Sequence, residues 1–316
     1  MMVGGGLLAI ILLLTVAAPW LAPYDPREQQ DLLMRRLPPG TVLHLVILQG
    51  GRQVLAERVE RTPLGLAIER RGRWEKIAAE QVLNLTDEGV EDRRYFLLGT
   101  DGVSRDVLSR ILYGGRISLL IGLLSILIAL TVGVAVGSLA ATGSRWLDYL
   151  FMRGVDAALA FPALFLLLAL SSVFDSGVWL LALLLGGTSW MGVSRLIRAD
   201  LLGLRKRDFV LAARASGLGR WRLLTRHLIP NAWSPVVVQA TLLLGDIVLI
   251  EAALSFLRMG VQPPTPTWGN MIADGQPDLG SAWWISTFPG IALAITVISV
   301  NLLADGFRDV LEPRRS

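Results

Sequence analysis

Three carboxylates lie within long apolar runs of this 316-residue chain: Asp156, Asp246 and Glu251. A charged side chain inside a membrane is costly, so it usually faces a partner, a bundle interior or a water-filled path. Asp246 and Glu251 are five residues apart, about 140° around a helix, which excludes a facing acid pair. We expect them either to line or brace a translocation path, or to bond polar groups of neighbouring helices. Asp156 follows Arg153 by three residues, which predicts a local ion pair.

Other reactive residue types are scarce. The chain has no cysteine, which excludes disulfides, thiolate catalysis and cysteine-ligated metals, and its two histidines, His44 and His227, are far apart in sequence. It has no G-x-x-x-x-G-K-[ST] loop, no H-E-x-x-H and no G-x-S-x-G motif. We therefore expect neither an enzyme nor a metal or cofactor site, and no hydrolysis of ATP by this chain itself.

The composition is that of a polytopic membrane protein, with 53% hydrophobic and 18% charged residues. The lipid bilayer is the expected partner, and the net charge of +4 reports on orientation rather than on nucleic acid. A cleaved signal peptide is the competing interpretation of the first apolar run, Val3–Ala22. It is disfavoured because the run is longer than the apolar part of a signal peptide and no basic residue precedes it. Six apolar runs predict six transmembrane helices: Val3–Ala22, Ile117–Ala141, Gly154–Phe174, Val178–Ile197, Pro235–Leu257 and Trp284–Ala304.

A charged segment between the first two runs, Pro26–Tyr95, has the composition of a soluble domain. Gly50–Gly51 and Arg71–Gly72 are turn signals within it. The fold class predicted is an all-α polytopic membrane protein with a small β-rich extracytoplasmic insertion between helices 1 and 2. Its strands are expected at Thr41–Leu48, Gln53–Val59 and Leu66–Arg70. The predicted domains are a transmembrane helix (1–25), the β-rich domain (26–95) and an interfacial helix plus a five-helix core (96–316).

The segment Leu98–Arg116 predicts an amphipathic helix with Ser104 as its N-cap. Val107, Leu108, Ile111 and Leu112 share one side, while Arg105, Asp106, Ser109 and Arg110 share the other. A helix in the membrane interface and a soluble helix packed on the preceding domain both fit this pattern.

Orientation follows from the basic residues. Positive charge is concentrated in the loop around Arg145 and Arg153, in the segment 205–234 and in the C-terminal tail with Arg308, Arg314 and Arg315. The turn Asp175–Gly177 and the loop Gly260–Trp283 contain no Lys or Arg. By the positive-inside rule, both termini are expected in the cytoplasm and the β-rich domain outside.

The basic segment Arg205–Pro235 predicts a helical hairpin. The first helix begins at Asp208, Gly217 and Gly219 interrupt it, and a second helix runs to Pro230. Trp221, Leu224 and Leu228 are spaced to form an apolar ridge on that second helix. Such a hairpin suits docking in a groove of a cytoplasmic partner, although most basic loops serve only to set topology.

Four blocks resemble one family. The run from Ala212 to Asn231, with A-A-R-A-S-G and H-L-I-P-N, is similar to the EAA motif of ABC-importer permeases. Leu98–Leu119, Met152–Leu164 and Glu251–Met271 resemble the dipeptide/oligopeptide/nickel group, in particular the member of the permease pair that carries the GTD segment.

The resemblance implies a permease subunit of an importer for peptides or a similar solute, in a prokaryotic cytoplasmic membrane. It implies a heterodimeric pore with a sister permease, two cytoplasmic subunits that bind ATP and Mg, and an extracytoplasmic solute-binding protein. A non-transporting sensor complex acting through residues 26–95, and a stand-alone channel or secondary transporter, are the alternatives. The residues implied to couple to the ATPase are Ala212, Ala213, Gly217, Leu218, Arg220, Trp221, Leu224 and Pro230.

Three departures from the family pattern stand out. Leu211 occupies the usual position of the motif glutamate, so its replacement by alanine should be mild. Ser104 and Arg258 replace glycines, which puts the turn geometry there in doubt. The segment 26–95 is longer than the usual first external loop.

Overall fold

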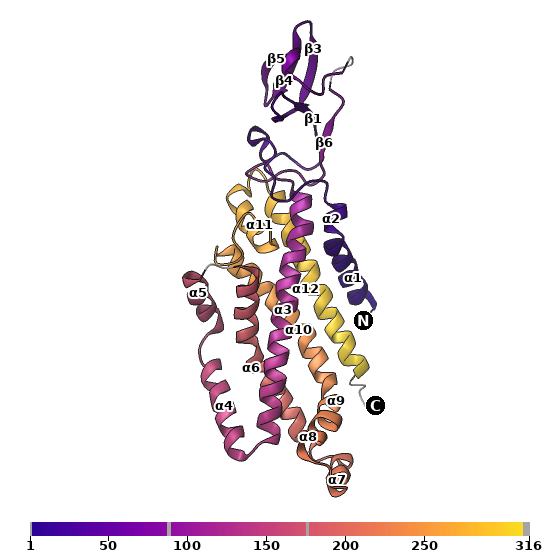
Figure 1. Ribbon diagram of the computed structural model, residues 1–316, viewed down its shortest axis with the longest axis vertical. Helices are drawn as coiled ribbons and strands as arrows, with labels where there is room; N and C mark the ends of the chain where they lie inside the picture. The colour runs from indigo at the N-terminus through magenta and orange to yellow at the C-terminus, as the bar shows by residue number, and fades with distance from the viewer. Residues whose placement is uncertain (1, 87–89, 175–176, 312–316) are drawn as a thin grey trace. The chain divides into compact units, whose positions relative to one another are not determined.

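The computed structural model describes residues 2–86, 90–174 and 177–311 (Figure 1). Its chain divides into two compact units. One, the helical unit, contains residues up to Leu13, Ile117–Gln262 and from Leu293 onward. The other, the mixed unit, contains Leu14–Arg116 and Pro263–Ala292. Of the predicted turn Asp175–Gly177, residues 175 and 176 lie outside the described residues, as do Arg314 and Arg315 of the tail.

Long helices dominate the chain because a helix satisfies all its backbone hydrogen bonds internally, as a lipid environment requires. Among the described residues, four helices are long and apolar enough to cross a membrane: α3, α6, α10 and α12. A fifth crossing results if α4 and α5, bent by 76° at their junction, count as one span. The bounds are α1 Met2–Val16, α2 Ala18–Leu21, α3 Val107–Thr142, α4 Arg145–Leu159, α5 Ala163–Val173, α6 Val178–Leu204, α7 Asp208–Ala215, α8 Arg220–Leu223, α9 Ile229–Asn231, α10 Trp233–Phe256, α11 Trp268–Gly275 and α12 Trp284–Leu311.

Two predicted spans are interrupted. The run Val3–Ala22 forms α1 and the short α2, which has Pro19 in its first turn. The run Gly154–Phe174 is split between α4 and α5, with Pro162 before the first residue of α5. In both places proline cannot donate a backbone hydrogen bond and its ring hinders the preceding turn, so the helix stops and restarts.

The separate interfacial helix expected within Leu98–Arg116 is instead the beginning of α3, a continuous helix of 36 residues. Gly114 and Gly115 do not break it. A Cβ atom on Gly115 would lie 2.5 Å from the ring of Trp268, whose Nε1 donates a 3.0 Å hydrogen bond to the carbonyl of Ile111. The two glycines therefore admit a bulky side chain against the helix.

The N-cap of α3 also differs from the prediction. Asp106, not Ser104, accepts a 2.7 Å hydrogen bond from the backbone N–H of Ser109. Ser104 lies in a left-handed turn with φ of +66°. A carboxylate directly before the first helical residue satisfies a free N–H group there and complements the helix dipole.

Within the helical unit, α3 and α6 pack closely through glycine. Gly133 and Gly137 of α3 are one turn apart, and a Cβ on either would lie within 3 Å of atoms of α6. Gly186 of α6 approaches Ser125 of α3 in the same way. Small residues let helix backbones approach where lipid offers no hydrophobic driving force for association. A buried apolar core surrounds this contact, including Ile121, Leu185, Val193, Ile197 and Ile247.

The described residues of the mixed unit form two three-stranded antiparallel sheets, ordered β2-β1-β6 and β3-β4-β5. The predicted strands Thr41–Leu48 and Leu66–Arg70 correspond to β1 and β4, and Gly50, Gly51 and Gly72 take the positive φ that their turns need. The predicted strand Gln53–Val59 is extended as expected but is not a single strand, because the chain changes sheets at Glu57 and forms β2 and the start of β3. The bounds are β1 Thr41–Ile47, β2 Gln53–Ala56, β3 Arg58–Thr62, β4 Gly65–Arg70, β5 Arg73–Ala78 and β6 Arg93–Phe96.

Candidate functional site

The polar segment 205–234 connects the end of α6 to the start of α10 (Figure 1). Its first helix, α7, begins at Asp208 as predicted and ends in a Schellman motif. Gly217 has φ of +79°; its N–H donates to the carbonyl of Arg214 at 2.9 Å, and the N–H of Leu218 donates to that of Ala213 at 3.2 Å. Glycine suits this position because it adopts the left-handed conformation without a Cβ clash. The break at Gly217 is thus a defined turn.

The second half of the segment is wound differently from the predicted helix. Between α8 and α9, Leu224–Leu228 form a π-helical turn, in which the N–H of Ile229 donates to the carbonyl of Leu224. Pro230 lies inside α9 and does not end the helix at that point. The wider turn just before Pro230 relieves the clash that a proline ring causes with the preceding turn.

The side chains of this half of the segment differ in burial. Leu224 and Leu228 are buried, together with Leu223, but Trp221 is 72% exposed. The predicted apolar ridge of Trp221, Leu224 and Leu228 is therefore wrong. The buried leucines anchor the segment on the helical unit, and the tryptophan remains outside.

The remaining predicted coupling residues differ in exposure. Ala212, Gly217, Arg220 and Pro230 are exposed, whereas Ala213 and Leu218 are half-buried. Leu211 is exposed too. The exposed members leave this segment open to a partner.

Two of these residues, Leu218 and Arg220, line a cavity of about 330 Å³. Arg205 and Arg214 also line it, which the sequence alone did not indicate. Burial lowers the pKa of Arg205, and the positive charges of Arg214 and Arg220 lower that pKa further. A cluster of guanidinium groups of this kind can hold an anion.

The two carboxylates of α10 have different surroundings. Glu251 is 0% exposed and accepts hydrogen bonds from the Ser118 hydroxyl of α3 at 3.0 Å and from the Ser255 hydroxyl at 2.8 Å. Asp246 is exposed on the surface of the helical unit. The structure does not bring the two together. Glu251 ties α10 to α3, and Asp246 is available to solvent or to a partner.

The predicted ion pair between Arg153 and Asp156 is wrong. Asp156 pairs with Arg195 of α6, and the Arg153 guanidinium lies over the Tyr149 ring, 5.5 Å from its centre. Because α4 packs beside α6, an arginine on the neighbouring helix reaches the carboxylate, which sequence spacing cannot show.

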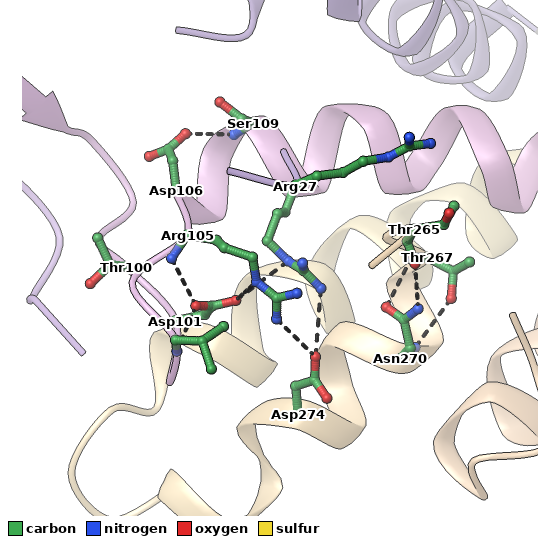
Figure 2. A network of polar contacts seen from close by, with 12 residues as sticks. Arg27, Thr100, Asp101, Arg105, Asp106, Ser109, Thr265, Thr267, Asn270 and Asp274 are labelled. Carbon is green, nitrogen blue, oxygen red and sulfur yellow. Dashed lines mark hydrogen bonds and ion pairs between the residues drawn. The ribbon is translucent and has the colours of Figure 1, made fainter. Parts of the chain in front are cut away.

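A second polar cluster, in the mixed unit, was missed by the sequence reasoning (Figure 2). Arg105 donates from Nε to Asp101 at 2.7 Å, and Arg105 and Arg110 each place an Nη2 atom 3.5 Å from Asp274 of α11. Arg110 is only 2% exposed. The carboxylates of Asp101 and Asp274 offset part of the free-energy cost of burying this guanidinium group.

The capping box of α11 helps to fix that cluster. Thr267 accepts from the N–H of Asn270 at 3.2 Å, and the Asn270 side chain accepts from the N–H of Thr267 at 2.9 Å (Figure 2). Beside the cluster, burial raises the pKa of Asp106; hydrogen bonds from Ser109 oppose that shift, and the charge of Asp101 adds to it. Helical periodicity treated this polar face as exposed, and no local signal points to Asp274 as its partner.

Comparison with known proteins identifies the chain. A family model described as the binding-protein-dependent transport system inner membrane component matches residues 133–316, more than half of the chain. The chain belongs to this family. A further model, described as the N-terminal TM domain of oligopeptide transport permease C, matches residues 1–39.

Relatives of this family member include transport proteins of two bacteria. The di/tripeptide transport system permease protein of Pseudomonas aeruginosa is 36% identical over 313 residues, covering 98% of this chain and 87% of that protein. A Brucella suis protein named as a peptide permease is 44% identical over 218 residues, covering 68% of this chain and 72% of that protein. The resemblance to ABC peptide-importer permeases is therefore confirmed.

A solved structure shares the fold of this inner membrane component. The inward-facing MetNI methionine ABC transporter matches with a TM-score of 0.53 and 18% identity, covering 64% of this chain and 95% of that chain. Together with the apolar helices, family membership indicates a multi-pass inner-membrane protein of the permease class. The match to residues 133–316 includes the whole segment 205–234, whereas the strands β1–β6 lie outside both family matches.

Proposed function

We propose that this chain is the permease subunit of an ATP-driven importer for peptides, and that with a sister permease it forms the translocation path. The observation that carries the proposal is the position of the segment 205–234. It leads directly from α6 into α10, so a force on its exposed residues acts on two apolar helices at once. The similarity over 98% of the chain to a di/tripeptide permease supports peptides as the solute and disfavours a sensor or stand-alone channel.

In this proposal, two cytoplasmic subunits bind ATP and Mg and contact the segment 205–234. Their closure displaces α7 and α8, and the rigid turn at Gly217 transmits the movement to α6 and α10. Ala212, Leu211 and Trp221 offer exposed surface for that contact. Leu224 holds the segment to the helical unit. A solute-binding protein delivers the solute from the opposite side.

The proposed topology has six spans, with α1 as the first and α4 plus α5 as the third. Both termini are cytoplasmic, and residues 26–95 are an extracytoplasmic insertion between a first span (1–25) and the remaining chain (96–316). The basic residues of the segment 205–234 support this orientation. Asp246, exposed on an apolar helix, is proposed to face the path, and Glu251 to brace the wall behind it.

The deciding experiment compares Gly217→Val with Gly219→Val. A valine at position 217 must adopt φ of +79°, whereas Gly219 has φ of −66° and ψ of 151°, which valine accepts. Both sites are exposed, so neither substitution meets a packing clash. We expect Gly217→Val to insert normally and to uncouple peptide uptake from ATP hydrolysis, while Gly219→Val transports. Normal uptake by Gly217→Val would refute the coupling role of this turn.

A further inference from the structure

A basic cavity lies where the segment 205–234 meets the ends of two long apolar helices of the helical unit. Arg205 follows the last residue of α6, Arg214 lies in the last turn of α7, and Arg220 is the first residue of α8. Thr142 and Gly143, at the end of α3, complete the polar lining. The cavity has a volume of about 330 Å³, within the range of small-ligand pockets.

Among the described residues, no negatively charged side chain pairs with the arginines of this cavity. No carboxylate lines it, and none of its three arginines forms an ion pair with the described residues. One guanidinium, that of Arg205, donates to the carbonyl of Ala141, which fixes its position. Three like charges held close together repel, so an anion with several acceptor oxygens would stabilise the arrangement. Guanidinium groups match phosphate oxygens in geometry as well as charge.

The surroundings of the cavity are typical of the level of lipid headgroups. The apolar helices α3 and α6 end at Thr142 and Leu204, next to the cavity. Arg145 and Trp146 begin α4, two residues after Gly143, and the tryptophan is 73% exposed. Exposed tryptophan beside a basic residue at the end of an apolar helix is typical of the membrane–water interface. Basic pockets between helices on the cytoplasmic side bind acidic headgroups.

We propose that this cavity binds the phosphodiester headgroup of an anionic phospholipid. The bound phosphate neutralises Arg214 and Arg220, one on each side of the turn at Gly217, and so holds α7 and α8 together. This ligand site goes beyond the proposed transport function. It requires only that α3 and α6 cross the membrane, and the exposed residues Leu211 and Trp221 remain free for a protein partner.

The test uses the full-length chain purified in a neutral detergent and titrated with phosphatidylglycerol or phosphatidylcholine, with bound lipid counted by native mass spectrometry. The cavity variant is Arg214→Gln/Arg220→Gln. Its matched control is Arg222→Gln/Arg226→Gln, which removes the same charge from exposed arginines outside the cavity lining. At about fivefold per arginine near a membrane surface, the cavity variant should bind phosphatidylglycerol about 30-fold more weakly than the unaltered chain. The control should keep most of the phosphatidylglycerol affinity, because it leaves every guanidinium group of the cavity lining in place.

Arg214→Lys/Arg220→Lys separates ligand binding from folding, since it keeps the charge and should retain most phosphatidylglycerol affinity. Three results would overturn the proposal. If the cavity variant and the control lost phosphatidylglycerol affinity equally, the lipid would be attracted by surface charge in general and not by the cavity. Displacement of the lipid by millimolar inorganic phosphate would indicate a free-phosphate site. Unchanged lipid binding with loss of ATPase capture in the cavity variant would assign the cavity to a carboxylate of that subunit.

Discussion

Replacing Gly137 by alanine should loosen the contact between α3 and α6. A Cβ atom at this position would lie 2.5 Å from the backbone carbonyl oxygen of Ser194 and 3.0 Å from the Cβ of Ile197. The first of these is a backbone atom, which cannot rotate away, so the two helices must move apart. Gly192, within α6 itself, is the matched control, because a Cβ there meets no heavy atom within 4 Å.

The size of the effect follows from two opposing contributions. Inserting a methyl group into a packed contact costs roughly 1–3 kcal/mol. Replacing glycine by alanine within a helix returns about 0.5–1 kcal/mol, because alanine loses less conformational entropy. Gly137→Ala should therefore lower the free energy of unfolding by up to about 2.5 kcal/mol, with a central value of about 1 kcal/mol. Gly192→Ala, which has only the second contribution, should be neutral or slightly stabilising.

Thermal unfolding of the two variants in the same detergent would measure the difference, with tryptophan fluorescence as the probe. Gly133→Ala offers a second site on the same face, where a Cβ would lie 2.6 Å from that of Val193, and it should destabilise similarly. If Gly137→Ala and Gly192→Ala melted together, the close approach of α3 and α6 would not contribute to stability, and the reasoning would fail.

Three further substitutions test other parts of the molecule by the same melting assay. Glu251→Ala removes the acceptor of two hydroxyl hydrogen bonds and should cost roughly 2–4 kcal/mol, whereas Glu251→Gln should cost about half as much. Burial raises the pKa of Asp106 in the folded state, so the folded chain holds this proton more tightly than the unfolded chain. The resulting stabilisation is fully present below the unfolded-state pKa of about 3.9 and is lost as the pH rises through the raised folded-state pKa. Asp106→Asn can keep the hydrogen bond from the Ser109 N–H and does not ionise. The melting temperature of this variant, relative to that of the unaltered chain, should therefore rise as the pH is raised from 4 to 7. A difference in melting temperature that stays constant over this range would contradict the prediction. Arg258→Gly should stabilise by up to about 1 kcal/mol, and a clear loss would argue against strain there.

The sequence predicted those features that depend on local chemistry. Apolar runs located α3, α6, α10 and α12 to within a few residues at most ends, since a helix is the structure that an apolar environment permits. Runs of strand-forming residues between glycine turns located β1 and β4. The glycine break at Gly217 was also predicted, because it depends on a single backbone conformation.

Features that depend on distant partners were not predicted. Asp156 was assigned to the arginine three residues before it, but the packing of α4 beside α6 brings Arg195 closer. The polar face of α3 was treated as exposed, yet Arg110 is buried against Asp101 and Asp274, the latter more than 160 residues away. Trp221 was assigned to one ridge with Leu224 and Leu228, but only the two leucines are buried in the core of the helical unit. Each outcome is set by tertiary contacts that a local pattern does not contain.

Arg258 and Gly217 show why a missing family glycine need not abolish a turn. At the end of α10 the N–H of Met259 donates to the carbonyl of Leu254 at 2.8 Å, and that of Arg258 donates to Ser255 at 3.1 Å, the same Schellman bonding that ends α7. Arg258 adopts φ of +64° to make it, at a cost of about 1–2 kcal/mol for a residue with a side chain. The turn is retained because two backbone hydrogen bonds and the contact of Gly260 with Ser255 hold it from both sides. The turn at Gly217 has the same two backbone hydrogen bonds but no such close approach, since a Cβ on Gly219, which is placed as Gly260 is, would meet nothing within 4 Å. The left-handed conformation there therefore depends more on the glycine itself, and this is the reason to test coupling at Gly217.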